Sequence, residues 1–524
     1  MVRTVFYYLA VLTPLLVAAG GWFWPPAWWL LGVVLPLIAI GIYDVFSRHN
    51  VLNNYPVIGH LRYLLEFLRP ELRQYFFESE TSGRPFNREQ RNTVNARADG
   101  KPDISAFGTI QDVENAGFDF ARHSLVVREL DESAGRIVFG GPQCDRPYHG
   151  SRLNISAMSF GSLSANAIRA MNRGAALGGF AHNTGEGGLS PYHLEYGADV
   201  IWELGSAYFG CRTKTGRFDA QEFAEKAANE HVKMIEIKLS QGAKPSYGGL
   251  LPAVKITEEI ARTRGIEMGR DCLSPPSHPE FDTPTGLLEF IAGVRELAGG
   301  KPVGFKLCLG WRSEFMGICK AMRETGILPD FITVDGAEGG TGAAPTEFTD
   351  RLGSYINDAL PFVHNALVGT GLRDDIRIIA SGKVAMGFDM VVKHALGANA
   401  CNAARPFMFA VGCIQARRCH TNKCPTGVTT QDPRRVRAVD VHSKGVRVRN
   451  FHRGTIDAFL KLTAALGCAH PDELSPDLIF HRPEYGPAQP YADLYPQLRP
   501  GQLLENDLPP EYARDWRAAS ADRF

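Results

Sequence analysis

The sequence predicts an α/β fold: a (β/α)8 TIM barrel preceded by an N-terminal transmembrane helical hairpin. Three observations predict this fold. A stretch of forty residues near the N-terminus has no charged side chain, short apolar runs later alternate with helical segments, and polar side chains stand where those runs end. We expect four parts: two transmembrane helices in 1–48, a connector that packs on the barrel in 49–150, the barrel with a cysteine-rich loop in 151–470, and a C-terminal tail in 471–524.

The hairpin prediction rests on the charge-free stretch from Thr4 to Tyr43. This stretch divides at Trp24-Pro25-Pro26 into two apolar halves, each close to the ~20 residues that cross a bilayer as a helix. A signal peptide is the alternative for the first half, but a second apolar segment follows it at once. By the positive-inside rule both ends are cytoplasmic, since arginines flank the stretch: Arg3 before it, and Arg48, Arg62, Arg69 and Arg73 after it. We therefore expect a membrane-anchored protein whose main domain is cytoplasmic.

The net charge and the distribution of cysteines indicate which partners and which compartment to expect. Lys plus Arg and Asp plus Glu number 56 each, so no net field recruits nucleic acid, and we expect no nucleic-acid partner. Seven of the ten cysteines are scattered singly, mostly inside apolar runs. This is not a disulfide framework, and it indicates a reducing compartment.

Eight apolar runs are expected to form the barrel strands. They are residues 154–158, 179–182, 207–210 (the weakest), 234–238, 302–306, 331–335, 377–381 and 398–401. Chemistry in such barrels takes place at the carboxyl ends of the strands. The candidate residues of this chain fall at those ends.

Two loops after predicted strands carry polar groups. Asn183-Thr-Gly-Glu-Gly-Gly188 follows the second strand, and its glycines let the backbone approach a ligand while Glu186 offers a carboxylate. A plain glycine-rich turn is the alternative. Lys238 closes an apolar strand, where its cation could stabilise the negative charge of a reduced flavin. Lys306 closes a neighbouring strand, and a structural ion pair is its alternative role.

Three later segments suggest a phosphate site. Asp335 opens a glycine-rich loop that has neither Walker nor Rossmann spacing. Ser381-Gly382-Lys383 and residues 397–404 end the seventh and eighth strands, whose loops commonly bind phosphate in barrels. FMN, which has one phosphate and no adenylate half, fits such a site.

Three cysteines follow the eighth strand. Cys413, Cys419 and Cys424 are separated by five and four residues, and Pro425 comes directly after the last. Three thiolates can hold the three irons of a [3Fe-4S] cluster. A zinc site with His420 as fourth ligand, or ordinary buried cysteines, are the alternatives. Electron transfer is the leading interpretation.

The order of these motifs carries a resemblance to a known family. It runs from Ala-Met-Ser-Phe-Gly-Ser-Leu-Ser through Gln-Gly-Ala-Lys-Pro and Asp-Gly-x-x-Gly-Gly-Thr-Gly-Ala to Cys-x5-Cys-x4-Cys-Pro, over about residues 150–470. The chain resembles the FMN-binding synthase domain of glutamate synthases, as a stand-alone membrane-anchored member. The resemblance implies a (β/α)8 barrel with FMN and a [3Fe-4S] cluster that reduces 2-iminoglutarate, formed from 2-oxoglutarate and ammonia, to glutamate.

The resemblance also implies roles for single residues. Lys244, Glu186 and Lys238 would be catalytic, with Glu186 where ammonia arrives. Arg264 and Lys244 would bind the keto acid, because a guanidinium suits a carboxylate. Cys413, Cys419 and Cys424 would hold the cluster. The residues expected at the flavin are Ala157, Met158, Ser159, Lys238, Gln241, Lys306, Asp335, Gly339, Gly340, Ser381, Gly382, Lys383 and Asn402.

The chain also departs from the family pattern. It begins with the hairpin where the family has a glutaminase domain, so we expect no glutamine hydrolysis by that route, and a separate subunit could supply the ammonia. Arg-Gly-Ile stands at Arg264 where the family usually has Arg-His-Ser, and Cys-Asn-Ala-Ala replaces Gly-Phe-Gly-Thr near the eighth strand. Electrons would come from a ferredoxin or a membrane reductase. The alternatives are a related amine or N-methylglutamate-forming oxidoreductase, a membrane-linked amine dehydrogenase, or a non-catalytic electron-relay subunit.

Overall fold

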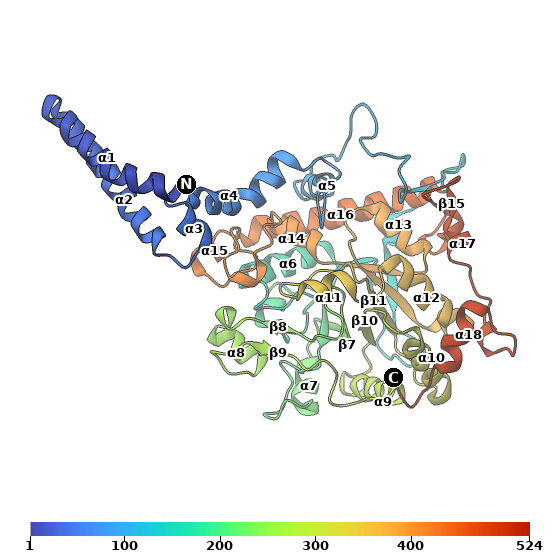
Figure 1. Ribbon diagram of the computed structural model, residues 1–524. Helices are drawn as coiled ribbons and strands as arrows, with labels where there is room; N and C mark the ends of the chain where they lie inside the picture. Colours follow the sequence, from blue (N-terminus) through green and yellow to red (C-terminus); the bar gives the residue numbers. More distant parts are fainter. Residues whose placement is uncertain (1) are drawn as a thin grey trace. The chain divides into compact units, whose positions relative to one another are not determined.

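The computed structural model describes residues 2–524 (Figure 1). The chain divides into two units, one ending at Arg88 and the other running from Glu89 to Phe524.

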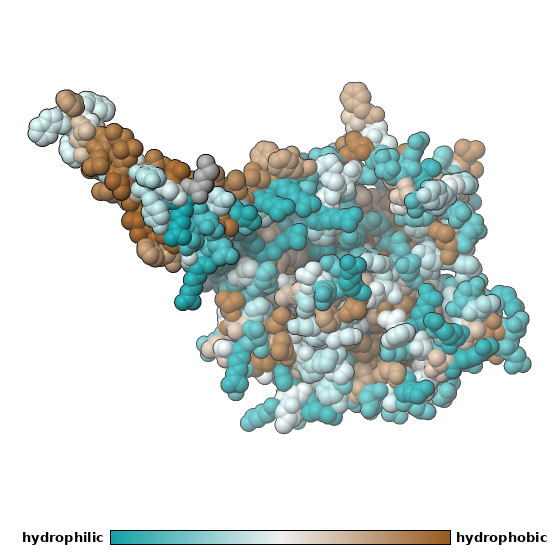
Figure 2. Space-filling model, in the orientation of Figure 1, coloured by the Kyte–Doolittle hydropathy of each residue, from teal (hydrophilic) through white to brown (hydrophobic). Residues whose placement is uncertain are grey.

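The first unit is helical and begins with the expected hairpin. Helix α1 (Val2–Phe23) is followed by the 3-10 segment η1 (Pro25–Leu30) and helix α2 (Leu31–Val45). Trp24 is extended and two prolines follow it, which ends one helix and starts the next. The spans Val2–Phe23 and Pro25–Val45 are long and apolar enough to cross a membrane, by length and composition. Their surface is mostly apolar, seen as brown in Figure 2.

Three short helical segments complete the first unit: α3 (Asn50–Asn54), α4 (Gly59–Leu72) and the π turn η2 (Arg73–Phe77). Asp44, near the end of α2, is fully buried. Its carboxylate accepts a hydrogen bond from the Val57 backbone N–H at 2.8 Å and lies 2.8 Å from Nε2 of His60. These contacts hold α4 against the end of α2.

The second unit contains a closed barrel of eight parallel strands, which confirms the predicted fold class. Strand β13 pairs with β4 and closes the ring. The strands are β4 (Leu153–Ile155), β5 (His182–Asn183), β6 (Val200–Leu204), β7 (Val232–Lys238), β10 (Val303–Leu307), β11 (Phe331–Asp335), β12 (Arg377–Ser381) and β13 (Ala400–Ala403).

Helices surround the barrel, and side-chain caps begin several of them. Ser164, Asp219 and Thr283 each accept a hydrogen bond from a backbone N–H of the first turn of α6, α7 or α9. The helices of the second unit are α5 (Arg88–Ala98), α6 (Ala165–Gly178), α7 (Ala220–Ala227), α8 (Glu258–Arg264), α9 (Pro284–Leu297), α10 (Arg312–Thr325), α11 (Thr346–Arg351), α12 (Ile356–Gly369), α13 (Gly387–Ala395), α14 (Arg405–Val411), α15 (Pro433–Val436), α16 (Val441–Ala465), α17 (Tyr491–Leu494) and α18 (Pro510–Ala518).

The predicted third strand was wrong. Residues 207–210 form a turn in which Tyr208 has a positive φ of 47°, and the strand is β6, a few residues earlier. β6 is Val-Ile-Trp-Glu-Leu, and Glu203 interrupts its apolar run. Because Glu203 is buried and its carboxylate is paired with Lys306, the charge belongs to the inside of the barrel.

A β-hairpin closes the amino-terminal end of the barrel. It consists of β2 (Arg136–Phe139) and β3 (Tyr148–Ser151). Ile137, Phe139 and Tyr148 from this hairpin share one buried cluster with residues early in the barrel strands: Ala181, Ile201, Met234, Phe331, Ile379 and Ala400. The amino-terminal end is therefore filled by apolar side chains, which leaves the carboxyl end for chemistry.

Two small sheets lie outside the barrel. One pairs β1 (Asp119–Ala121) with β14 (Ile479–His481), which also pairs with β15 (Gln489–Pro490). This sheet joins a segment before the barrel to one after it. The other sheet pairs β8 (Leu250–Leu251) with β9 (Cys272–Leu273), within the long excursion between β7 and β10.

Candidate active site

Strand register places five of the candidate residues at one end of the barrel. Lys238 on β7 is level with Lys306 on β10. Asp335 on β11 is level with Ser381 on β12, which is level with Asn402 on β13. All five lie at or near the carboxyl ends of parallel strands, so they share one rim.

A pocket opens beside β7 at this rim. Its empty volume, including space open to solvent, is about 300 Å³, at the small end of the usual range for ligand pockets. Four of the candidate residues line it: Glu186, Lys238, Gln241 and Lys244. The rest of the lining is Ser206, Leu239, Ser240, Ser246, Gly248, Pro275 and Pro276.

Two of the residues that line the pocket form an ion pair. Nζ of Lys238 donates to Oε2 of Glu186 at 2.8 Å. Burial alone would raise the pKa of Glu186, but the cation of Lys238, with those of Lys244 and Arg264, lowers it to about 2. Glu186 is therefore a carboxylate at neutral pH. A glycine makes its position possible, because a Cβ on Gly249 would lie 2.2 Å from Oε1 of Glu186.

Lys244 has the environment of a group that exchanges protons near neutral pH. Its side chain is buried at the pocket wall. Burial lowers its pKa to about 8, while Glu186 partly offsets this effect and Lys238 adds to it. A pKa near the working pH suits general acid–base catalysis.

The loop after β5 needs its glycines. Asn183 starts it by accepting the Gly185 backbone N–H at 2.9 Å through its side-chain oxygen. Gly185 has φ of +63°, and a Cβ there would lie 2.7 Å from the backbone nitrogen of Ser159. The loop is thus pressed against Met158 and Ser159, which follow Ala157 after β4. The structure therefore places the loop that carries Glu186 beside the segment that was predicted to contact the flavin.

Arg264 lies behind this loop and outside the pocket lining. Its Nη2 donates to Oγ of Ser159 at 3.1 Å and to the carbonyl oxygen of Phe160 at 3.3 Å. The guanidinium carbon lies 5.0 Å from the centre of the Phe209 ring. Its Nε is buried and has no hydrogen-bond partner among residues 2–524. One donor of this arginine is therefore unsatisfied within the described residues.

Lys306 is buried and paired inside the barrel. Its Nζ lies 2.9 Å from Oε2 of Glu203, so the ion pair that was its alternative role is present. Glu236 stands nearby and accepts hydrogen bonds from Asn183 at 2.8 Å and from Thr333 at 2.6 Å. Burial raises the pKa of Glu236 to about 7, with Lys306 opposing that rise. A polar network therefore fills this level of the barrel.

Polar side chains also lie at the ends of β11, β12 and β13 on the other side of the rim. Oδ2 of Asp335 accepts the backbone N–H of Gly242 at 2.9 Å, which joins the loops after β7 and β11. The side-chain oxygen of Asn402 is buried without a hydrogen-bond partner among residues 2–524. Lys383 has φ of +50° and follows Gly382, whose φ is +154°. Ser381 Oγ lies 3.4 Å from Oγ of Ser156.

Arg405, at the start of α14, is a residue that the sequence did not single out. Its Nη2 donates to the carbonyl oxygen of Glu338 at 2.9 Å. A Cβ on Gly340 would lie 2.9 Å from the Arg405 side chain, so the loop of Gly339 and Gly340 packs directly on this cation. The position of Arg405 directly after the eighth strand is the sequence feature that could have indicated a role at the rim.

The cysteine loop places its three thiols within electrostatic reach of one another. Burial raises the pKa of Cys413 to about 12, and the charges of Cys419 and Cys424 also raise it. Burial acts in the same direction on Cys424, yet hydrogen bonds from Thr429 and Thr426 leave its pKa lowered. Among residues 2–524, no group of three or more His, Cys, Asp or Glu side chains is arranged to hold a metal ion.

Two other residues support the site and were not predicted. Lys255 is buried, and its Nζ donates to the carbonyl oxygens of Ser162 and, at 3.4 Å, Cys419, which links the barrel rim to the cysteine loop. Nε2 of His278 lies 2.8 Å from the carbonyl oxygen of Lys238. Burial lowers the pKa of His278 to about 4, so it is neutral and donates from Nε2. His278 ends the local sequence Ser-Pro-Pro-Ser-His of residues 274–278, whereas no local signal marks Lys255.

Comparison with known proteins gives the same family as the sequence motifs. A family model described as the conserved region in glutamate synthase matches residues 143–469. The chain is 38% identical over 480 residues to the glutamate synthase large subunit-like protein YerD of Bacillus subtilis, covering 84% of this chain and 91% of that protein. It is 34% identical over 314 residues to the archaeal glutamate synthase (NADPH) of Methanocaldococcus jannaschii, covering 60% of this chain and 58% of that enzyme.

The solved structures that match this chain are less similar to it in sequence than these relatives are. The recombinant flavin-binding domain of baker's yeast flavocytochrome b2 matches with a TM-score of 0.41 and 14% identity, covering 80% of this chain and 85% of that one. That likeness is too low to bear on the site, whereas the match over residues 143–469 includes the strands, the pocket and the cysteine loop. The chain therefore belongs to the glutamate synthase family, whose members are oxidoreductases.

Proposed function

We propose that this chain uses FMN and a [3Fe-4S] cluster to reduce 2-iminoglutarate, formed from 2-oxoglutarate and ammonia, to glutamate. The observation that carries the proposal is the pocket itself, where the ion pair of Lys238 with Glu186 meets a second buried lysine, Lys244. Two cations with a single carboxylate suit an anionic substrate. Family membership supports the reaction class.

The residues at the rim fit FMN. The partnerless side-chain oxygen of Asn402 is an acceptor for a flavin N–H or a ribityl hydroxyl. Gly339, Gly340 and Gly382 allow close backbone approach, and Lys383 provides a cation for the phosphate. The other residues proposed at the flavin are Ala157, Met158, Ser159, Lys238, Gln241, Lys306, Asp335 and Ser381. FMN, when bound, supplies the hydride that reduces the imine carbon.

The chain's own side chains would then bind the acid and move protons. Lys238 places a positive charge at the pocket wall, where it stabilises negative charge on a reduced cofactor. Lys244 binds a carboxylate in its charged form and can give a proton to the imine nitrogen. Glu186, ionised and held by Lys238, would accept a hydrogen bond from ammonia or ammonium. Arg264 is proposed for the second carboxylate, supported by its partnerless Nε.

The cysteine loop suits an iron–sulfur cluster by its donor chemistry. Three thiols, Cys413, Cys419 and Cys424, act electrostatically on one another, and a cluster needs thiolates rather than thiols. Binding iron would remove the mutual repulsion that three thiolates would otherwise suffer. Cys413, Cys419 and Cys424 are therefore the proposed ligands.

The N-terminal hairpin is proposed as a membrane anchor, with the barrel on the cytoplasmic side. Its two helices have the length and hydropathy of membrane spans. Arginines after the second helix favour the cytoplasm for the segment that follows. Anchoring would keep the enzyme near membrane-bound donors and near a partner that supplies ammonia.

The test is a flavin re-oxidation assay on the detergent-purified, FMN-loaded protein. The protein is reduced anaerobically, and 2-oxoglutarate with ammonium is added while the flavin absorbance is followed. Rapid re-oxidation with glutamate formed would support the proposal, and Lys244→Met should abolish it while Lys101→Met, on the exposed surface, should not. A reducible flavin that ignores both substrates would contradict it and favour the amine or N-methylglutamate alternatives.

A further inference from the structure

Helix α4, in the first unit, carries an exposed apolar stripe. Five leucines recur along it at spacings of three and four residues, which places them on one face of the helix: Leu61, Leu64, Leu65, Leu68 and Leu72. Their exposed fractions run from 36% at Leu72 to 57% at Leu61. A helix of a soluble domain normally turns such a face toward a core. We call these five residues the leucine stripe.

The rest of α4 is also poorly supported by packing. Every residue from His60 to Leu72 is exposed. The helix has 14 residues, and an isolated helix of about this length is only marginally stable in water. Most helices in proteins gain their stability by packing an amphipathic face. A partner that covers the leucine stripe would supply that burial to α4.

Positive charge and aromatic rings accompany the leucine stripe. Arg62, Arg69 and Arg73 are separated by seven and four residues, so they lie along one side of the helix, beside the leucines. After the last turn of α4, Phe76 and Phe77 in η2 are 77% and 80% exposed. Leucines on one face, arginines on the polar face and aromatic residues nearby are typical of helices that lie in the plane of a membrane surface.

Contacts within the first unit fix the place where α4 begins. The side chain of Asn53, shortly before α4, accepts a hydrogen bond from Nη1 of Arg3 at 3.1 Å and donates one to the carbonyl oxygen of Val45. Arg3 is at the start of α1 and Val45 ends α2, so Asn53 joins the two open ends of the hairpin. Asp44 of α2 also contacts His60, in the first turn of α4. From this point α4 leads away from the hairpin instead of packing along it (Figure 1).

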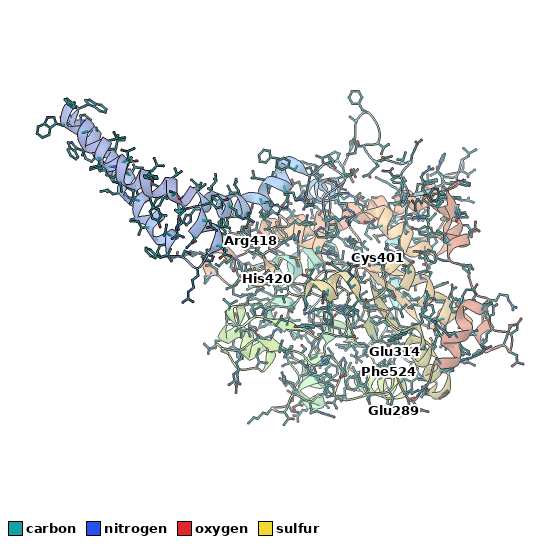
Figure 3. All side chains as sticks on the ribbon, viewed as in Figure 1. Glu289, Glu314, Cys401, Arg418, His420 and Phe524 are labelled. Carbon is teal, nitrogen blue, oxygen red and sulfur yellow. The ribbon has the colours of Figure 1, made fainter. Side chains whose placement is uncertain are left out.

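α4 is too short and too charged to cross a bilayer itself. Its 14 residues extend over about 21 Å as a helix, whereas the hydrocarbon core of a bilayer is about 30 Å thick. The side chains of α1 and α2, by contrast, project outward around the hairpin (Figure 3), and both helices have the length and hydropathy of membrane spans. When the hairpin spans the bilayer, the start of α4 therefore lies at the boundary between lipid and cytoplasm, within reach of the lipid.

We propose that α4 lies in the cytoplasmic surface of the membrane, with the leucine stripe against the lipid acyl chains and Arg62, Arg69 and Arg73 at the lipid phosphates. A guanidinium suits a phosphate, and its apolar stem can lie along the acyl boundary. The inference rests on the proposed anchoring by the hairpin. A bilayer is favoured over a second copy of the chain because α4 begins where the two ends of the hairpin meet. This second contact would fix the orientation of the first unit on the membrane, which a two-helix hairpin alone leaves free to tilt.

The test places the photoreactive residue p-benzoylphenylalanine at single positions of the full-length protein in nanodiscs of phosphatidylcholine and phosphatidylglycerol. Leu65→p-benzoylphenylalanine should form about tenfold more lipid adduct on illumination than Glu66→p-benzoylphenylalanine, because the apolar face of such a helix enters the acyl boundary by about 5–10 Å and the polar face does not. Glu66 is the matched control, since it is the next residue along the helix and its side chain is 53% exposed. Leu12→p-benzoylphenylalanine, in α1, reports on the hairpin separately. Mass spectrometry identifies each adduct.

The cross-linked products distinguish failure of this inference from failure of the anchor. Lipid adducts at Leu12 without any at Leu65 would overturn the placement of α4 and leave the anchor standing. Adducts at Leu65 without any at Leu12 would retain α4 as the membrane contact and contradict the hairpin. A covalent dimer formed from Leu65 would assign the leucine stripe to a second copy of the chain, and a link to residues 89–524 would assign it to the second unit. Either of these products would overturn the proposal.

A second measurement needs no variant. A phosphatidylcholine that carries a diazirine near its glycerol backbone labels whatever lies at the acyl boundary when the nanodiscs are illuminated. In the unmodified protein the label should appear on residues 61–72 as well as on the hairpin, and α9 (Pro284–Leu297), on the outside of the barrel, should stay unlabelled. Label on the hairpin with none on residues 61–72 would contradict the proposal.

Discussion

Nζ of Lys306 lies 2.9 Å from Oε2 of Glu203 inside the barrel, where both side chains are nearly inaccessible to solvent. Removing one partner of a buried pair leaves the other charge uncompensated, which typically costs about 3–5 kcal/mol. Lys306→Met should therefore lower the free energy of unfolding by that amount. The fully buried Trp202, next to Glu203 on β6, provides a fluorescence signal for denaturant titrations.

The double variant Lys306→Met/Glu203→Gln is the control for that prediction. It removes both charges, so it should recover a large part of the lost stability. If the double variant is as unstable as Lys306→Met, the loss of stability comes from packing rather than from the uncompensated charge of Glu203.

Much of the barrel could be predicted from the sequence because most of its strands are continuous apolar runs. β11 and β12 have the predicted bounds, and β7 and β10 differ by two residues or fewer. The exception is β6, where Glu203 is satisfied by a lysine about a hundred residues later. A local pattern cannot reveal that partner.

In the candidate active site, too, local patterns indicate single residues but not contacts between residues that are far apart in the sequence. Glu186, Lys238, Gln241 and Lys244 were predictable because each stands in a glycine-rich loop directly after, or at the end of, an apolar strand. Lys255 was not predictable, because its contact with the Cys419 carbonyl joins residues that are 164 positions apart. The place of Arg264 behind the loop, rather than in the pocket lining, likewise depends on three-dimensional packing.

Replacing Lys238 with Met should make the bound flavin harder to reduce. A charge-assisted interaction of about 1.5–3 kcal/mol corresponds to about 30–60 mV for a two-electron couple, and the midpoint potential should fall by that range. Spectroelectrochemical titration measures it. Lys233→Met is a matched control, because Lys233 is on the same strand at its amino end. An unchanged potential in Lys238→Met would show that this lysine acts only as the partner of Glu186.

The pH dependence of turnover should report on Lys244. Its pKa is lowered from 10.5 to about 8, so the protonated form dominates only below about pH 8. If Lys244 gives a proton to the imine, kcat/KM should be level below that pH and fall above it. Glu186 raises the pKa of Lys244, so Glu186→Gln should move the falling limb to lower pH. A limb that stays in place in Glu186→Gln would assign the titration to another group.

Gly249→Ala should disrupt the pocket without disturbing the barrel. The added Cβ would lie 2.2 Å from Oε1 of Glu186, so the carboxylate must move away from Lys238. We expect a loss of kcat/KM of about tenfold or more, the usual consequence of misplacing a catalytic group by about 1 Å. Gly293→Ala is the control, because its Cβ would have no neighbour within 4 Å. Equal activity in the two variants would mean that the ion pair is dispensable.

The cysteine loop gives a prediction that does not depend on turnover. Each of Cys413→Ser, Cys419→Ser and Cys424→Ser should remove iron and acid-labile sulfide from the anaerobically purified protein while FMN stays bound, because a serine oxygen is a poor ligand for iron in a thiolate cluster. Cys319→Ser is the control, since Cys319 is fully buried on α10. Zinc in place of iron and sulfide in the wild-type protein would instead establish the alternative that spacing alone left open. Because the pKa of Cys413 is raised to about 12, the free thiol is protonated at neutral pH, and iron uptake should release its proton and become faster as the pH rises.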